Sequence, residues 1–481
     1  MHRLASCPGI DPPEDVVLVE QPPADVLLLS SAGTDLSCLE SVVQASPDWC
    51  NQIRALHLDN LGHPAQLDHY LASTASQARL IVVRLLGSRG HWSYGLEQLQ
   101  RWSDKCADRQ LLVLAGTVDQ QVDLHGIGTV VPALADRLAA LLREGGETNM
   151  ARLLDAIQAL LNGTPPDSEE IEVAPLADPF PWDWQDDPGA TVGVVLYRAQ
   201  LQAGDTALAQ QLNQALRERG LRPRLIWVSS LRDPAVQAGV LDLLRSQGAQ
   251  VVISGTAFAS VTTEQAGLGS ALWDSLDRPV LQLLTASTSR ERWLESSRGL
   301  EPLDLSLQVV MPELDARVTT RPCAFRQARP PLGELATAIT TQQPDRDGIN
   351  WLVEHAARWI DLQDTPAEHR RVAMVLANYP VRDGRVANGV GLDTPASVVN
   401  IIGWLADAGY QLGEHPIPSN GDRLIASLLA GRTNSAEGRY RPPLDHLPLE
   451  TYQAWWDTIP SEAKARIVSR GGEPQQACDL D

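Results

Sequence analysis

The chain has 481 residues, of which 43% are hydrophobic and 21% are charged, and its formal net charge is −21. This length allows three or four domains, each with its own core. The acidic balance argues against general binding to nucleic acid or anionic membranes, because attraction to phosphate groups needs surplus Lys and Arg. We interpret the acidic surface as one that favours solubility. The alternative interpretation is an acidic face that binds a basic partner subunit.

The six cysteines, at positions 7, 38, 50, 106, 323 and 478, lie far apart and form no CxxC pair. Such spacing is typical of reduced thiols in the cytoplasm rather than of a disulfide framework or a zinc ribbon. In addition, no apolar stretch approaches the roughly 18 residues that span a bilayer. The sequence therefore predicts a cytoplasmic protein with no membrane partner.

The first predicted α/β domain covers residues 1–165. Apolar segments separated by helical spacing predict four strands, at Asp25–Leu29, Ile53–Leu58, Arg79–Leu86 and Gln110–Ala115. The breaker cluster Asn162–Pro166 marks the end of this domain.

A dense group of histidines and carboxylates lies within this domain. His57, Asp59, His63, Asp68 and His69 fall within 13 positions, and imidazole with carboxylate suits Co²⁺, Zn²⁺ or Ni²⁺. The spacing does not place them on one face of a helix or strand, so we interpret them as helix caps and surface polar residues. No resident metal site is predicted.

Two aromatic residues, Trp92 and Tyr94, follow Gly87 and Gly90 after an apolar strand. The chain has 13 Trp against 3 Phe, and flat rings beside a loop can stack on a planar ligand. The alternative is that Trp and Tyr fill the core and the contacts between domains. We take Trp92 and Tyr94 as candidate ligand contacts.

The second predicted domain, residues 185–330, has a βαβαβ pattern. Its strands are Val192–Tyr197, Arg224–Ser229 and Val251–Ser254. The first predicted helix begins at Asp205 and ends near Gly220, and the second begins at Asp233-Pro234 and ends near Gly248. Such a unit predicts a doubly wound parallel sheet of the Rossmann or flavodoxin kind. Val280–Leu284 and Leu305–Val310 are expected to complete the sheet, and residues 327–344 to be part linker and part short helix.

The third predicted domain, residues 345–481, contains a long polar loop. Val372–Ala377 predicts a buried strand, Thr394-Pro395 the capped start of a helix, and Gly409 its end. A strand-to-helix connection usually takes two to six residues, and ligand sites of open α/β sheets lie at this edge. The loop therefore predicts a binding site, with an Ω-loop packed on itself as the alternative.

The polar residues of this loop suggest distinct roles. Arg382 and Arg385 can pair with ligand carboxylates in a planar fork, and Asn378 and Asn388 can bond amide or carboxylate oxygens. Asp383 and Asp393 are expected to order the loop by accepting from its own backbone N–H groups. The predicted ligand-binding residues are Asn378, Arg382, Asp383, Arg385, Asn388, Asp393, Thr394, Trp92 and Tyr94.

The loop sequence NYPVRDGRVANGVGLDTPAS resembles the signature of the large subunit of aerobic cobaltochelatase, which is related to the magnesium chelatase large (H) subunit. Further segments resemble the same subunit: RLLGSRGHWSYG at Arg84–Gly95, EGGETN at Glu144–Asn149 and the stretch Pro279–Val318. The resemblance covers nearly the whole chain and implies the N-terminal portion of that subunit, either a truncation or a naturally short relative. It favours the cobalt branch, because the magnesium counterpart loop does not read DGRVANGVGLDTP.

The resemblance implies ATP-dependent insertion of cobalt into hydrogenobyrinic acid a,c-diamide, a corrin precursor, with cobalt as the substrate metal. ATP would be hydrolysed by a separate AAA+ partner working with an adaptor subunit, and this chain contains neither GxxxxGK[ST] nor a GxGxxG between strand and helix. The catalytic residues stay unknown, since the histidine motif of the family lies beyond this sequence, and the chain alone is expected to be inactive. The alternatives are the porphyrin-binding magnesium branch, a non-catalytic assembly module and a small-molecule sensor.

Overall fold

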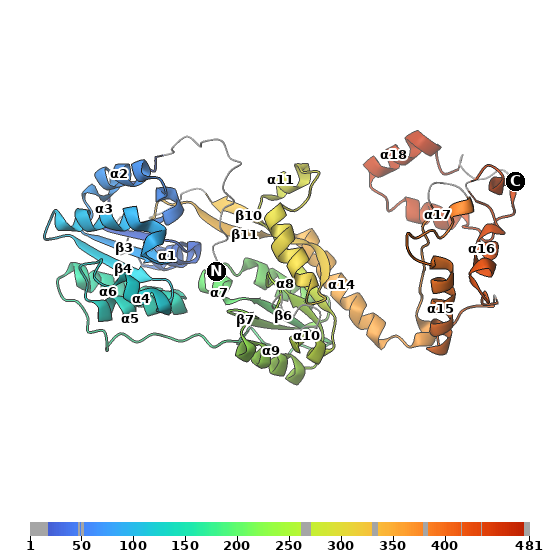
Figure 1. Ribbon diagram of the computed structural model, residues 1–481, viewed down its shortest axis with the longest axis horizontal. Coiled ribbons are helices and arrows are strands. Elements are labelled where there is room, and N and C mark those ends of the chain that lie inside the picture. The colour runs from blue at the N-terminus through green and yellow to red at the C-terminus, as the bar shows by residue number, and fades with distance from the viewer. Residues whose placement is uncertain are drawn as a thin grey trace. The chain divides into compact units, whose positions relative to one another are not determined.

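The computed structural model divides into two units, Met1–Asp361 and Leu362–Asp481, which we call the first and second units (Figure 1). It describes residues 18–46, 49, 52–260, 271–329, 335–378, 383–414, 416–433 and 435–475. Within these residues, no helix combines the length and the apolar character needed to cross a membrane.

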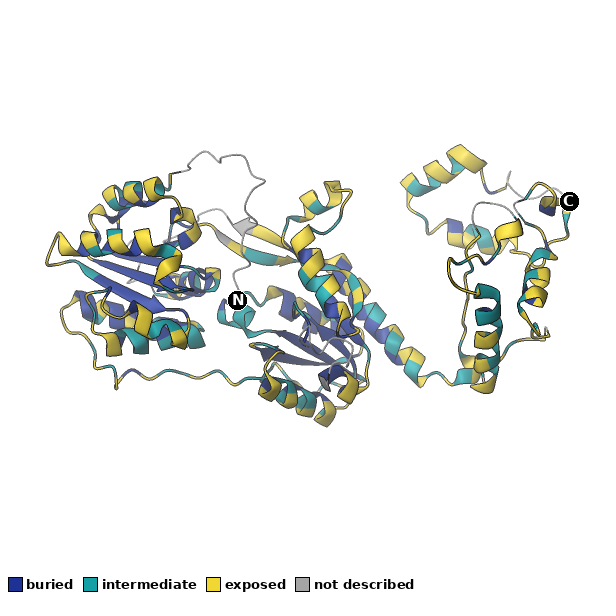
Figure 2. Cartoon of the chain, in the orientation of Figure 1, coloured by how far each residue is buried: buried dark blue, intermediate teal, exposed yellow. Residues whose placement is uncertain are grey.

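The first unit begins with a four-stranded parallel sheet in the order β2-β1-β3-β4. Its strands are β1 (Val26–Ser30), β2 (Ile53–His57), β3 (Leu80–Leu85) and β4 (Gln110–Ala115), which confirms the four predicted strands. Their side chains are almost all buried, as expected for a parallel sheet covered on both faces (Figure 2).

Helices cover both faces of this first sheet (Figure 1). One core includes residues of α1, α5 and α6, and the other includes residues of α2 and α3. The helical segments are α1 (Gly33–Ala45), η2 (Leu58–Leu61), α2 (Pro64–Ala72), η3 (Thr74–Ser76), η4 (Arg89–Trp92), α3 (Ser93–Asp104), η5 (Val118–Gln120), α4 (Gln121–Leu124), α5 (Pro132–Glu144) and α6 (Glu147–Leu161).

A seven-stranded sheet follows in the order β11-β10-β9-β8-β6-β7-β5. Its strands are β5 (Phe180–Trp182), β6 (Thr191–Tyr197), β7 (Arg222–Val228), β8 (Ala249–Ser254), β9 (Val280–Ala286), β10 (Val318–Arg329) and β11 (Ile339–Pro344). The central pairs are parallel, and β5 and β11 add antiparallel edges. The predicted α/β class with parallel sheets is therefore confirmed.

The helical segments around the second sheet are α7 (Arg198–Gln202), α8 (Ala207–Glu218), α9 (Pro234–Ser246), α10 (Ala271–Leu276), α11 (Arg290–Glu295), α12 (Pro302–Leu305), η6 (Ser306–Val310), α13 (Met311–Glu313) and α14 (Arg346–Asp364). Helix α14 packs into the core of this sheet through Ile349, Leu352 and Val353. Asp233 caps α9 by accepting from the Ala235 backbone N–H at 2.8 Å, as predicted.

Three local predictions for this sheet are wrong. Leu305–Val310, which was predicted to complete the sheet, is helical and half exposed, because Pro302 begins a helix there. The strand that pairs with β9 is β10 instead. Residues 327–344 contribute to β10 and to the edge strand β11 instead of a short helix. Asp205 does not cap α8, since Thr206 is the N-cap and the Asp205 carboxylate accepts from the Gln342 backbone N–H at 3.1 Å.

The second unit is helical in its described residues. It contains η7 (Ala367–His369), η8 (Asp383–Arg385), α15 (Thr394–Asp407), α16 (Gly421–Leu429), η9 (Gly438–Tyr440), α17 (Leu449–Trp456) and α18 (Ser461–Gly471). The predicted strand Val372–Ala377 is wrong. This segment pairs with no strand among the described residues, and Val375 is 93% exposed. The predicted domain limits, 1–165, 185–330 and 345–481, stay a prediction.

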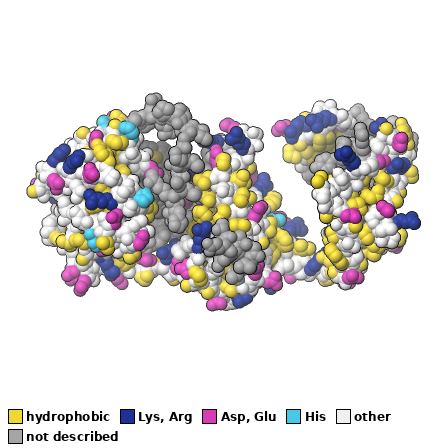
Figure 3. Space-filling view, viewed as in Figure 1, with side chains coloured by type: hydrophobic (Ala, Val, Ile, Leu, Met, Phe, Trp, Pro, Cys, Tyr) yellow, Lys and Arg dark blue, Asp and Glu magenta, His cyan; other side chains and the backbone are white. Residues whose placement is uncertain are grey.

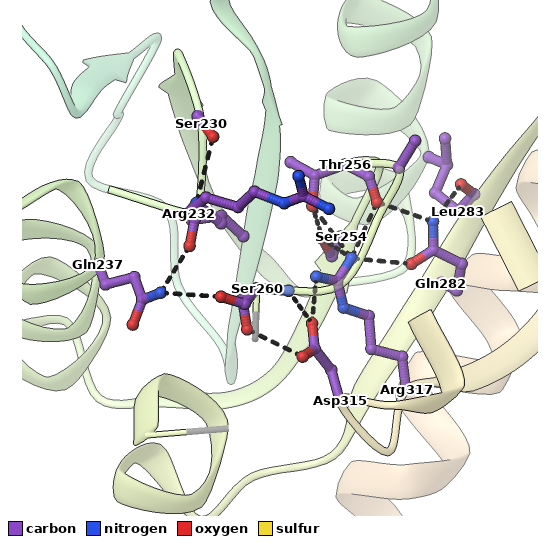
Figure 4. Close-up of polar contacts among 12 residues, drawn as sticks. Ser230, Arg232, Gln237, Ser254, Thr256, Ser260, Gln282, Leu283, Asp315 and Arg317 are labelled. Atoms are coloured by element: carbon purple, nitrogen blue, oxygen red, sulfur yellow. Dashed lines mark hydrogen bonds and ion pairs between the residues drawn. The ribbon is translucent and has the colours of Figure 1, made fainter. Parts of the chain in front are cut away.

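A buried ion pair ties the second sheet to its loops (Figure 4). Arg317, immediately before β10, donates to Asp315 Oδ2 at 2.6 Å, and both side chains are inaccessible to solvent. The same guanidinium donates to the Thr256 carbonyl at 2.8 Å and to Gln282 Oε1 at 3.1 Å. Asp315 in turn accepts from the Ser260 backbone N–H at 2.7 Å. The loop that follows β8 is thus held by a network in which each charge is compensated.

Replacing Asp315 with Ala should destabilise the first unit by about 3 to 5 kcal/mol, because it leaves the buried Arg317 charge without its carboxylate. The matched control is Glu97→Gln, which removes an exposed ion pair with Arg101 and should change stability by less than about 0.5 kcal/mol. The free energy of unfolding in urea measures both. Equal stability of the two variants would show that the network contributes little.

Candidate functional site

Residues 378–394, which we call the signature loop, are anchored near their start by Asp383. Its carboxylate accepts from Ser435 Oγ at 2.9 Å and from Arg441 Nη1 at 3.3 Å. Burial acts to raise the pKa of Asp383, but hydrogen bonds from Thr433 and Ser435 and the Arg441 charge outweigh it and hold the pKa below its usual value. Ser435 and Arg441 are 52 and 58 residues further along the chain, whereas we predicted bonds to the loop backbone.

The end of the signature loop is fixed by the start of α15. Asp393, rather than the predicted Thr394, is the N-cap, and its Oδ1 accepts from the Ala396 backbone N–H at 3.1 Å. Thr394 is the first helical residue, and its buried Oγ1 has no hydrogen-bond partner among the described residues. A side chain at Gly389 would place its Cβ 2.8 Å from that oxygen, which explains the glycine at this position.

The signature loop exposes polar side chains, two of them between these anchors and one, Asn378, before Asp383. Arg385, Asn378 and Asn388 are exposed, and none of the hydrogen bonds among the described residues involves their side chains. The backbone of Asn378 forms an isolated bridge with Val386. Arg382 lies outside the described residues. The guanidinium of Arg385 and the amide of Asn388 are therefore available to a ligand.

Apolar side chains are exposed in and around the same loop. Val390 is fully exposed, Leu392 is 60% exposed, and Trp404 on α15 is 66% exposed. Figure 3 shows hydrophobic side chains at several places on the surface of the second unit. The signature loop and α15 thus expose apolar side chains as well as the Arg385 guanidinium, and this combination suits a ligand with both apolar and acidic parts.

Trp92 and Tyr94 belong to the first unit, and both have partners within the protein. The Trp92 ring packs against the sheet core, and its Nε1 donates to the Leu61 carbonyl at 3.3 Å. The Tyr94 hydroxyl donates to the two carboxylate oxygens of Asp68 at 2.8 and 2.9 Å, and this bond raises the pKa of Tyr94. Their predicted contact with a ligand stays a prediction.

The histidines of the first unit include two helix caps, as predicted. His57 Nδ1 accepts from the Asp59 backbone N–H at 3.3 Å, and His63 Nδ1 accepts from the Ala65 backbone N–H at 3.2 Å. His63 also completes a capping box with Gln66. The described part of the chain shows no group of three or more His, Cys, Asp or Glu placed to hold a metal ion.

A cavity that the sequence patterns did not predict lies at the carboxyl edge of the first sheet, with a volume of about 140 Å³. It is lined by Asp35 from the first turn of α1, by Arg84 from β3 and by Arg143 from α5. These residues are far apart in the sequence, so spacing alone does not connect them. The feature of the sequence that could have indicated this cavity is Arg84, a charged residue inside an otherwise apolar strand.

Comparisons with known proteins agree with the sequence motifs. The family model described as CobN/Magnesium Chelatase matches residues 139–480. The aerobic cobaltochelatase subunit CobN of Pseudomonas aeruginosa is 32% identical, over 99% of this chain and 39% of the relative, and that of Sinorhizobium sp is 34% identical, over 93% and 36%. The large (H) subunit of the magnesium chelatase of Rhodobacter capsulatus is 25% identical, over 57% of this chain and 24% of the relative.

The fold is also found in a solved relative. The catalytic subunit of cobaltochelatase from Mycobacterium tuberculosis superposes with a TM-score of 0.67 and 25% identity, over 94% of this chain and 36% of that one. The chain thus spans 36 to 39% of the length of these cobaltochelatase relatives. Because the family model matches most of its residues, the chain belongs to the CobN/Magnesium Chelatase family.

Proposed function

We propose that this chain is part of the tetrapyrrole-binding large subunit of a cobaltochelatase and that the signature loop contacts the ring. The observation that carries this proposal is the loop itself, which Asp383 and Asp393 fix at its ends while Arg385 and Asn388 stay exposed. The identity of 32 to 34% with two CobN subunits, against 25% with the large subunit of a magnesium chelatase, supports the cobalt branch.

The chemistry of a corrin precursor matches the exposed groups of the loop. Hydrogenobyrinic acid a,c-diamide carries carboxylates and amides around a largely apolar ring. Arg385 can bind a carboxylate through two parallel N–H···O bonds, and the Asn388 amide can pair with a ring amide. Val390 and Leu392 offer apolar contact to the ring itself.

The described part of the loop does not supply the base that metal insertion needs. Two pyrrole N–H protons must leave as cobalt enters, so a proton acceptor has to reach the ring. Asp383 is a poor acceptor, because its pKa is held low by Ser435, Thr433 and Arg441. Asp393 is engaged as a helix cap. We place the base outside this loop and expect the chain alone to be inactive.

The proposal includes the partners that the family resemblance implies. Cobalt enters as the substrate metal, and a separate AAA+ ATPase with an adaptor subunit hydrolyses ATP. We place this work in the cytoplasm, where free thiols such as the exposed Cys106 stay reduced.

Titrating the chain with hydrogenobyrinic acid a,c-diamide should quench its tryptophan fluorescence, because a bound macrocycle absorbs energy from nearby indoles. A module that only docks partner subunits, or a sensor for an unrelated small molecule, would bind this ring no better than an unrelated planar anion. Saturable quenching supports ring binding. Its absence would favour the assembly or sensor alternatives.

Replacing Arg385 with Ala should weaken that binding by about 1 to 3 kcal/mol, since charge-assisted hydrogen bonds to a ring carboxylate are lost. The matched control is Arg470→Ala, which removes another exposed arginine of the second unit, on α18. The dissociation constants from quenching compare the two variants. An affinity unchanged in Arg385→Ala, or lowered equally in both, would move the ring site elsewhere.

Mixing the chain with cobalt, ring, ATP and the two partner subunits should give no cobalt insertion, because the base is placed outside the signature loop. Insertion is followed by the change in the absorption spectrum of the ring. Sustained turnover would show that this chain contains a base that we have not assigned.

A further inference from the structure

The cavity of the first sheet lies where the strand connections turn to opposite faces. Helix α1, after β1, packs in one core of the sheet, and α3, after β3, packs in the other. Between the carboxyl ends of two such strands, the diverging connections leave a crevice, which is the usual ligand position in open α/β sheets. Ala32 follows β1 and Leu86 follows β3, and both line the cavity.

The charges that line this cavity do not cancel. The lining contains two guanidinium groups, Arg84 and Arg143, against one carboxylate, Asp35. Asp35 already pairs with Arg84 Nη1 and accepts from Ser30 Oγ at 2.5 Å. Glu147 influences the cavity thiol Cys38 from nearby but does not line the cavity. Among the lining residues one positive charge is therefore left over, because arginine stays protonated in proteins. Asp136 and Glu144 do not line the cavity, but their charges act on Arg143 and oppose the fall of its pKa.

Arg84 keeps one buried donor without a partner among the described residues. Arg84 is 8% exposed, and its buried Nε has no hydrogen-bond partner among the described residues. The half-exposed Arg143 side chain donates one long bond within the described residues, from Nη1 to the Ala115 carbonyl at 3.4 Å. Burial, and then the charge of Arg84, lower the pKa of Arg143, as expected for two guanidinium groups held close together. The buried Nε of Arg84 favours an acceptor ligand, because an unpaired buried donor is costly.

Two helices begin at the cavity without a side-chain cap. Helix α1 has 13 residues and follows Ala32, and α6 has 15 residues and follows Gly146. Ala32, Thr34, Gly145 and Gly146 line the cavity. The free N–H groups and the positive dipole end of a helix start attract anions. The neighbouring Cys38 stays a neutral thiol, because burial raises its pKa to about 12.

From this geometry we propose that the cavity binds one small oxyanion group, a carboxylate or a phosphate. Arg143 and the free Nε of Arg84 hold its oxygens, and the starts of α1 and α6 complete the positive surroundings. Asp35 keeps Arg84 in place by pairing with its Nη1. This site belongs to the first unit and does not depend on ring binding by the signature loop.

Calorimetric titration of the full chain at low salt tests the site with two probes, inorganic phosphate and succinate. Saturable binding of either supports it, and the tighter probe identifies the source as a phosphate or a carboxylate. Replacing Arg143 with Gln should weaken that binding about tenfold or more, because a charge-assisted bond is lost while the Asp35–Arg84 pair stays intact.

The matched control is Arg101→Gln, on the exposed surface of α3, which should leave the affinity unchanged. Thermal unfolding of both variants verifies that they fold. Thr34→Val provides a second, uncharged test, since it removes only a lining hydroxyl and should weaken binding by a smaller factor. The proposal would be overturned if neither phosphate nor succinate gave a heat of binding. It would also be overturned if the Arg143→Gln and Arg101→Gln variants bound the probe with equal affinity.

Discussion

Burial of both faces of its parallel sheets is the constraint on which the first unit depends. Strands such as β1, β3 and β6 are apolar nearly throughout, so polar chemistry is confined to the ends of the strands. In the second sheet the protein fills this region itself, with the Arg317–Asp315 pair and its hydrogen bonds. In the first sheet a cavity remains, and Arg84 keeps a donor that the described residues do not satisfy. Among the described residues, the first sheet thus has a cavity at the ends of its strands, whereas the second has a buried ion pair near the end of β8.

In the second unit, the signature loop is not supported by a sheet among the described residues. Two carboxylates hold the loop in place instead. Asp383 accepts hydrogen bonds from Ser435 and Arg441, and Asp393 caps α15. A loop fixed in this way can present Arg385 to a ligand without support from a strand.

Sequence patterns predicted those parts of the fold that depend on local hydrophobicity. The buried parallel strands β1 to β4 and β6 to β9 stand out as apolar runs between helices. Val372–Ala377 has the same composition, yet it is exposed, because a strand also needs a neighbour that a local pattern cannot reveal. The loop anchors were missed in part for a similar reason, since Asp383 and Ser435 are 52 residues apart. The cavity was missed because Asp35, Arg84 and Arg143 meet only in the folded sheet.

The central claim, that the signature loop receives a tetrapyrrole, is tested most directly by hydrogen–deuterium exchange of the chain with and without hydrogenobyrinic acid a,c-diamide. The account predicts slower exchange of backbone amides in residues 383–397 when the ring is present, because bound side chains hold this loop closed. Unchanged exchange in this segment, with ring-dependent protection elsewhere in the chain, would contradict it.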